Sequence, residues 1–142
     1  MEGAFAVADT GFVVALLNSS DIKHKDVTAV YLQQRQILLP QTVLAEVAYL
    51  LGRDAGIPIV VAFLRGMANS RFHVVALTDS DLKRVAEILE KYADSRIDFV
   101  DASVMAVAEC YGSTKILTLD QRDFRLFRPQ RIAKVLRFCP EN

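Results

Sequence analysis

The segment RIDFVDASVMAVAE, from Arg96 to Glu109, decides how the rest of this chain of 142 residues is interpreted. It opens with two aspartates, Asp98 and Asp101, and continues in small and apolar residues. Residues three positions apart lie on one side of a helix, and the positive end of the helix dipole favours carboxylates there. We therefore predict a helix that starts near Asp98 and whose small residues, among them Ala102 and Ser103, let it lie close to a sheet.

Apolar runs of strand length occur on both sides of this helix in the sequence. They are Phe5 to Ala8, Ile37 to Pro40, Phe72 to Leu77 and Lys115 to Leu119. Continuous apolar runs are typical of parallel strands that are buried on both faces. Because helical patterns alternate with them, we predict an α/β fold, a three-layer α/β/α sandwich with a mostly parallel sheet of about four to five strands. The candidate fifth strand, at an edge, is Lys134 to Phe138.

The helices between the strands are predicted from capping residues and from apolar residues at helical spacing. The expected N-terminal capping or starting residues are Thr10, Asp21, Thr42 and Thr78, and a further helix is expected from Ile59 to Met67. No internal repeat or linker interrupts this pattern. We therefore expect residues 1–142 to form a single domain.

Composition and charge indicate a packed domain without a membrane span. The chain is 52% hydrophobic and has a formal net charge of zero. No run reaches the roughly 18 apolar residues of a membrane helix, and the apolar N-terminal stretch lacks the basic cluster of a signal peptide. Cys110 and Cys139 form no CxxC motif and are expected to be free thiols of a reducing compartment. We therefore expect a cytoplasmic protein.

Acidic residues occur where a sheet of this kind forms binding sites, at the carboxyl ends of its strands. Asp9 ends the first strand and Asp120 ends the fourth. The helix that follows the second strand carries Glu46 in its first turns, and the helix that leads into the fourth strand starts with Asp101. The predicted site thus has four main carboxylates, Asp9, Glu46, Asp101 and Asp120, and four auxiliary residues, Asp98, Asp123, Thr10 and Thr118.

Several carboxylates in one place repel one another, and a hard divalent cation relieves that repulsion. Mg²⁺ and Mn²⁺ prefer oxygen ligands, and Mg²⁺ also binds substrate phosphates. The residues therefore predict metal-assisted hydrolysis of a phosphodiester, in which the metal lowers the pKa of a bound water and stabilises charge on the phosphate oxygens.

Each acid also has an ordinary structural explanation. An aspartate after a strand can simply start a turn, and the aspartates at a helix start can serve only the helix dipole. With Thr10 as the helix cap, however, Asp9 is left without that role, and the apolar neighbours of Glu46 argue against a purely solvated side chain. The common placement of the acids is the stronger argument.

The ordered acidic blocks resemble a known family. The blocks are Ala8 to Asn18, Leu44 to Val47, Asp98 to Ser103 and Thr118 to Phe124. Together they resemble the PIN domain, the ribonuclease domain of VapC-type toxins, over essentially the whole chain. The resemblance implies an endoribonuclease that depends on Mg²⁺ or Mn²⁺, commonly a homodimer, that a small VapB-like antitoxin holds inactive. It also implies that the four main carboxylates form the metal site, with Asp9, Asp101 and Asp120 as ligands.

Two further features agree with this expectation. From Lys115 to Asn142 the chain has seven basic and three acidic residues, and RNA binding needs basic side chains near phosphates. Arg122 and Arg125 are closest in sequence to the site and are the predicted RNA contacts, although an ordinary solvated surface explains such a run equally well. The apolar helix Ile59 to Met67 is expected to form core and an interface, either with a second copy or with the antitoxin.

Three other functions compete with this interpretation. A non-catalytic PIN-like module that binds RNA or protein is the main alternative, and the intact acids argue against it. An aspartyl phosphohydrolase usually has a second aspartate two residues after the first, where this chain has Gly11. A receiver-like signalling domain has a lysine after a late strand, whereas Lys115 precedes the fourth strand.

Overall fold

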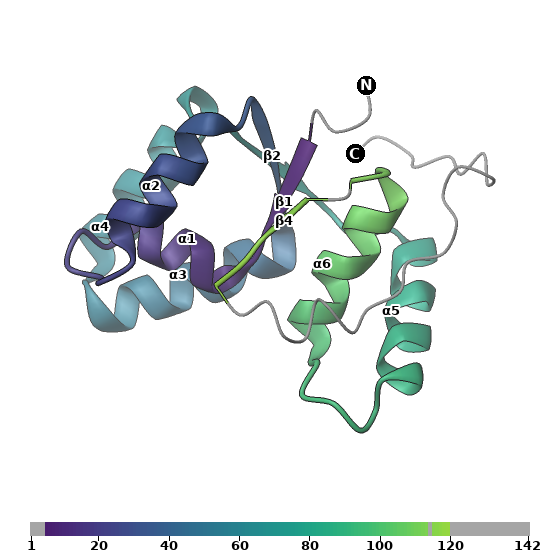
Figure 1. Ribbon diagram of the computed structural model, residues 1–142. Helices are drawn as coiled ribbons and strands as arrows, with labels where there is room; N and C mark the ends of the chain where they lie inside the picture. The colour runs from purple at the N-terminus through teal and green to yellow at the C-terminus, as the bar shows by residue number, and fades with distance from the viewer. Residues whose placement is uncertain (1–4, 114, 120–142) are drawn as a thin grey trace.

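Four parallel strands form one sheet in the computed structural model, which describes residues 5–113 and 115–119 (Figure 1). The strands are β1 (Phe5–Ala8), β2 (Gln36–Pro40), β3 (Phe72–Val75) and β4 (Ile116–Leu117). Their order is β3-β2-β1-β4, so that β1 lies between β2 and β4. The predicted parallel α/β class is confirmed. The expected fifth strand, Lys134 to Phe138, lies outside the described residues.

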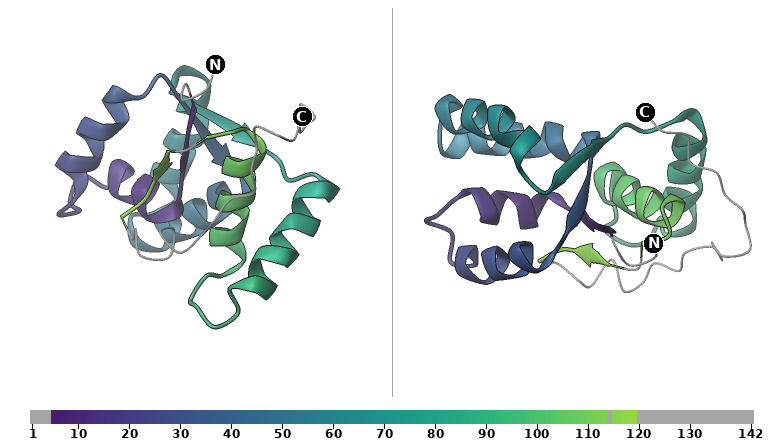
Figure 2. Two further views of the ribbon diagram at one scale, coloured as in Figure 1. Left: turned by 45° about the vertical axis from the view of Figure 1, so that its right-hand side comes forward. Right: turned by 90° about the horizontal axis from the view of Figure 1, so that it is seen from above.

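Helices cover both faces of this sheet. They are α1 (Thr10–Leu17), α2 (His24–Gln33), α3 (Gln41–Asp54), α4 (Ile57–Gly66), α5 (Asp79–Lys91) and α6 (Phe99–Cys110), with a short 3₁₀ turn η1 (Met67–Asn69). The turned views show α1 to α4 on one side of the sheet and α5 with α6 on the other (Figure 2). The three-layer arrangement is therefore confirmed. Gly56, with φ of +96°, makes the turn between α3 and α4 in a conformation that other residues rarely adopt.

Helix α6 lies between two apolar clusters. Every residue from Ala102 to Glu109 is buried. Val104 and Val107 belong to the main cluster, which includes β1 and β2, whereas Met105 belongs to a second cluster with residues of α5. The small residues of α6 thus allow helices and sheet to approach it from both sides, as the sequence predicted. This double burial fixes the rotation of α6 about its axis and therefore the direction of side chains in its first turn.

A buried ion pair joins α5 to α6. The guanidinium of Arg84 donates to both carboxylate oxygens of Glu109, from Nε to Oε1 at 2.7 Å and from Nη2 to Oε2 at 3.1 Å. The side chain of Glu109 is completely buried and that of Arg84 is 14% exposed. Paired geometry of this kind offsets the cost of removing two charges from water.

Two predicted helix caps are wrong, by one and two residues. Asp9, not Thr10, is the N-cap of α1, because its Oδ1 accepts a hydrogen bond from the backbone N–H of Phe12. Asp21 instead accepts from the N–H of Lys23, so it forms a local turn and α2 starts only at His24. Aspartate is a slightly better N-cap than threonine, which explains the first difference.

The start of α3 also differs from the prediction. The helix begins at Gln41 after Pro40, without a side-chain cap, so Thr42 lies inside the first turn. The hydroxyl of Thr42 is therefore not used as a helix cap. By contrast, the predicted start of α5 is confirmed, since Thr78 and Asp81 form a reciprocal capping box.

Cys110, at the end of α6, is disulfide-bonded, so the prediction of a free thiol at this position is wrong.

In the part of the chain that the structure describes, every helix is too short or too polar to cross a membrane.

Candidate active site

The carboxyl ends of β1 and β4 are neighbours, as the predicted site requires. The backbone N–H of Asp9 donates to the carbonyl oxygen of Leu117 at 3.1 Å, which brings the residues after both strands to the same edge. Thr118, the predicted auxiliary residue, directly follows β4 at this edge. Four predicted site residues lie outside the described residues: Asp120, Arg122, Asp123 and Arg125.

Asp9 stands at the start of α1 and is almost completely buried, with 9% of its surface exposed. Its carboxylate caps the helix through Oδ1, and the helix dipole favours its negative charge. The sequence assigned the capping role to Thr10 and left Asp9 without one. In the structure Asp9 itself is the N-cap, so its ordinary structural explanation holds. The cap also fixes the direction of the carboxylate, which a binding site needs.

Glu46 is joined to this region by a side-chain hydrogen bond. The hydroxyl of Thr10, the first residue of α1, donates a short hydrogen bond to Oε1 of Glu46 in α3. The bond links the starts of two helices that follow neighbouring strands. This hydrogen bond thus holds the Glu46 carboxylate beside the start of α1.

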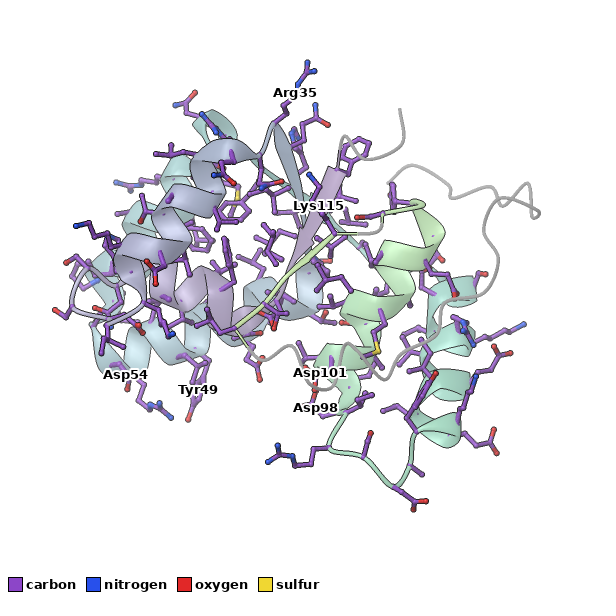
Figure 3. All side chains as sticks on the ribbon, in the orientation of Figure 1. Arg35, Tyr49, Asp54, Asp98, Asp101 and Lys115 are labelled. Carbon is purple, nitrogen blue, oxygen red and sulfur yellow. The ribbon has the colours of Figure 1, made fainter. Side chains whose placement is uncertain are left out.

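Asp98 and Asp101 form a reciprocal capping box at the start of α6, where Figure 3 shows them side by side. Oδ1 of Asp98 accepts from the N–H of Asp101 at 2.9 Å, and Oδ2 of Asp101 accepts from the N–H of Asp98 at 3.2 Å. Asp98 is exposed and Asp101 is half-buried. Asp98 is thus the N-cap of the helix, whereas Asp101 faces the more enclosed region.

The electrostatics of Asp101 connect it to Asp9. Partial burial is the largest cause that raises the pKa of Asp101, to about 7. The backbone hydrogen bond from Asp98 lowers the pKa, whereas the negative charges of Asp98 and Asp9 raise it further. A carboxyl group that still holds its proton near neutral pH is in a place where an additional positive charge is favourable.

The sequence did not predict a pair of hydroxyl groups that joins α3 to α6. Thr42 Oγ1 and Ser103 Oγ lie 2.6 Å apart and join the first turn of α3 to the first turns of α6. Ser103 was interpreted only as a small residue that lets α6 approach the sheet. The one available signal was the hydroxyl of Ser103 itself, which stands among alanine, valine and methionine residues in this segment.

The donor set suits a hard cation, although the described part of the site is incomplete. Asp9, Glu46 and Asp101 offer carboxylate oxygens, and the raised pKa of Asp101, caused mainly by burial, means that a bound cation would stabilise its ionised form. Within residues 5–113 and 115–119, no three His, Cys, Asp or Glu side chains lie close enough together to hold a metal ion. A third side-chain ligand for a metal at Asp9 and Asp101 would therefore lie outside the described residues, and Asp120 is the predicted one.

The opposite edge of the sheet carries basic residues. Arg35 and Lys115 directly precede β2 and β4, and both lie far from Asp98 and Asp101 in Figure 3. Arg35 and Lys115 thus lie at the sheet edge opposite to the one that carries Asp98 and Asp101.

Comparison with known families agrees with this geometry. The model of the family described as "PIN domain" matches residues 6–128. The chain belongs to the PIN domain family. Among curated proteins, this PIN domain is 28% identical to the ribonuclease VapC26 of Mycobacterium tuberculosis over 124 residues, which is 87% of this chain and 92% of that protein.

Solved structures with the same fold include a VapC toxin and a VapBC complex. VapC20 of M. tuberculosis, described as a toxin that cleaves the sarcin–ricin loop, superimposes with a TM-score of 0.78 at 24% identity, over 85% of this chain and 93% of that chain. VapBC2 of Rickettsia felis, bound to a DNA fragment from its promoter, has a TM-score of 0.66 at 16% identity, over 87% of this chain and 92% of that chain. The expected resemblance to a VapC-type PIN domain is confirmed.

Proposed function

We propose that this PIN domain is a Mg²⁺- or Mn²⁺-dependent endoribonuclease and the toxin of a VapBC-type toxin–antitoxin pair. The observation that carries the proposal is the convergence of three helix starts, those of α1, α3 and α6, each of which brings a carboxylate to the same edge of the sheet. The similarity to a VapC ribonuclease over most of both chains supports the reaction class.

The site residues have distinct proposed roles. Asp9 and Asp101, with Asp120, would hold the metal, and Glu46, oriented by Thr10, would bind the metal's water or accept a proton from it. When bound, the metal lowers the pKa of a water molecule and stabilises charge on the phosphate oxygens. Asp98 fixes the start of α6, and Thr118 with Asp123 would orient carboxylates or waters. Arg122 and Arg125 remain the proposed contacts to RNA phosphates.

Removal of divalent metal is expected to abolish RNA cleavage. The carboxylates alone offer no positive charge to stabilise the phosphate oxygens, so cleavage of purified total RNA should fall to background in EDTA. Addition of Mg²⁺ or Mn²⁺ in excess should restore it. The measurement is the mapping of newly formed RNA ends before and after metal is returned.

An Asp9→Asn variant is the matched control for this experiment. Asparagine is as good an N-cap as aspartate, so α1 should form normally, while one proposed metal ligand loses its charge. Cleavage that persists in EDTA, or that persists undiminished in the variant, contradicts the metal mechanism. A folded wild-type chain that binds RNA without cutting it would favour the non-catalytic module instead.

The proposed antitoxin would cover an apolar pocket between α1, α2 and α4. This pocket has a volume of about 430 Å³. The residues that line it are Leu16, Leu17, His24, Thr28, Tyr31, Leu32, Ala62, Phe63, Gly66, Ser70 and Phe72. Of the ten residues of α4, only Val60 and Phe63 are buried, whereas Ile57 and Leu64 are exposed. An exposed apolar helix beside an open pocket is typical of a surface that a partner covers.

An Ala62→Arg substitution is expected to prevent neutralisation by the antitoxin without reducing RNA cleavage. Ala62 is exposed and lines the pocket, so a long charged side chain there blocks an apolar partner while leaving the core of α4 unchanged. The measurement is growth on co-expression with the proposed antitoxin. Ala68→Arg, also exposed but outside the pocket lining, is the control. Neutralisation that is equally strong in both variants contradicts this location.

Two further properties belong to the proposal. A homodimer is the proposed oligomeric state, and the exposed apolar residues of α4 give a second copy an alternative surface to bind. The proposed location is the cytoplasm, where RNA is available. The disulfide bond at Cys110 removes the argument from free thiols, so this proposal rests on the function alone.

A further inference from the structure

Two helices of the site are joined by a chain of hydroxyl groups. Oγ of Ser103 donates to the carbonyl oxygen of Val100 at 2.7 Å, and the same Oγ lies 2.6 Å from Oγ1 of Thr42. Because the Ser103 proton is engaged with Val100, the hydroxyl of Thr42 is the donor in the second bond. The hydrogen bonds thus run in one direction, from Thr42 to Ser103 to Val100.

This series of hydrogen bonds ends beside two of the proposed site residues. Val100 directly precedes Asp101 in the first turn of α6, and Ser103 follows it by two positions. Thr42 is one helical turn before Glu46 in α3. The hydroxyl groups therefore link the turn that carries Asp101 to the turn that precedes Glu46, while Thr10 links Glu46 to the start of α1.

We propose that Thr42 and Ser103 are positioning residues that fix the first turn of α6, and with it the Asp101 carboxylate, relative to α3, and so determine how tightly the site binds its divalent metal. This inference rests on the proposed function, because it assigns the pair a role in the same site. Neither hydroxyl touches substrate or metal. They act by fixing the position of α6 relative to α3.

The burial of Ser103 supports a specific role. Ser103 is completely buried in a helix whose neighbouring residues are alanine, valine and methionine. An alanine at this position would pack there without leaving a polar group to satisfy. The hydroxyl is thus not needed to fill space, and its two hydrogen bonds are directed at the turn of Asp101 and at α3.

The test compares Mn²⁺ binding in the full-length wild-type chain with that of Ser103→Ala and Thr42→Val. Mn²⁺ affinity is measured by electron paramagnetic resonance, and cleavage of purified ribosomal RNA gives kcat and KM. Each variant is expected to bind Mn²⁺ about 10-fold more weakly, since residues that orient ligands typically contribute this much. We expect kcat at fixed Mn²⁺ to fall, with KM for RNA within about 2-fold of wild type, because the hydroxyls do not contact RNA.

Two further variants separate positioning from simple packing. Thr42→Ser keeps the donor and should restore the Mn²⁺ affinity of the wild type. The double variant Thr42→Val/Ser103→Ala should bind Mn²⁺ about as tightly as the single variant with the lower affinity. The two effects should not add, because both single changes break the same hydrogen bond.

Ser113→Ala is the matched control. The hydroxyl of Ser113 donates to the carbonyl oxygen of Phe5 at 3.0 Å, at the opposite edge of the sheet. Its loss should lower the melting temperature without changing Mn²⁺ affinity.

Each outcome distinguishes this inference from the proposed function. Wild-type cleavage that depends on metal, together with unchanged Mn²⁺ affinity in Ser103→Ala and Thr42→Val, overturns the positioning role and leaves the function intact. A wild-type chain that binds Mn²⁺ but does not cleave RNA overturns the function, while the affinities of the variants still decide the positioning role. A folded wild-type chain that binds no Mn²⁺ overturns both.

Discussion

An Asp101→Asn variant is expected to lose RNA cleavage and yet, without metal at pH 8, to unfold at a higher temperature than the wild type. Asparagine keeps an oxygen that can accept the N–H of Asp98, so the start of α6 is retained. The lost carboxylate is a proposed metal ligand, and we expect cleavage to fall by a factor on the order of a thousand.

The gain in stability follows from the raised pKa of Asp101, from 3.8 to about 7. Between these values the folded chain holds a proton that the unfolded chain has released, so the free energy of unfolding decreases as the pH rises. Above pH 7 the ionised carboxylate is therefore a destabilising group in the metal-free protein. Since the side chain is half-buried, solvent screening reduces the effect, and we expect a gain of roughly 1–2 kcal/mol, or about 3–6 °C.

Thermal unfolding at two pH values, with and without Mg²⁺, tests this prediction. At pH 5 Asp101 is protonated in the folded wild type, so the advantage of the variant should shrink. Saturating Mg²⁺ at pH 8 should raise the melting temperature of the wild type more than that of the variant. A variant that is less stable than the wild type at pH 8 without metal would show that the ionised carboxylate of Asp101 does not destabilise the folded protein.

An Arg84→Met variant is expected to lose about 3–5 kcal/mol of folding stability. Methionine is similar in length to the apolar part of arginine, but it leaves the completely buried carboxylate of Glu109 without its guanidinium partner. Because this pair attaches α5 to α6, the loss should also affect the helix that carries Asp101. Chemical denaturation monitored by circular dichroism gives the change in the free energy of unfolding.

Two comparisons make the Arg84 result specific. The double variant Arg84→Met/Glu109→Leu removes both charges and should recover much of the lost stability, because apolar side chains can replace a buried ion pair. Arg53→Met breaks the exposed pair of Arg53 with Asp54 and should leave stability unchanged. An equal loss in the Arg53 and Arg84 variants would contradict the importance of burial.

The fold was predictable because its strands and helices differ clearly in pattern. Runs such as Phe5 to Ala8 are continuously apolar, and the alternation of strands and helices leaves few arrangements other than a parallel sheet covered on both faces. The small residues of α6 correctly indicated close contact with that sheet. Helix starts were less accurate, because Asp9 and Thr10 are both good caps and adjacent in the sequence.

The site could be predicted only as far as topology determines it. Neighbouring strand ends place Asp9 near the residues after β4, and helix direction brings Asp101 to the same edge. The hydrogen bond between Thr42 and Ser103 was not predictable, because it depends on the rotation of α3 against α6, which no local pattern specifies. The roles of Asp120 and Arg122 stay predictions, as both lie outside the described residues.

The position of Asp9 and Asp101 at one edge of the sheet has a thermodynamic consequence. The edge with Asp9 and Asp101 repels a polyanion in its metal-free form, so a cation bound there must strengthen the binding of RNA. By reciprocity, RNA must strengthen the binding of the cation by the same factor. Substrate and metal are thus mutual effectors at one site, and a chain with a formal net charge of zero needs no overall positive field to hold RNA.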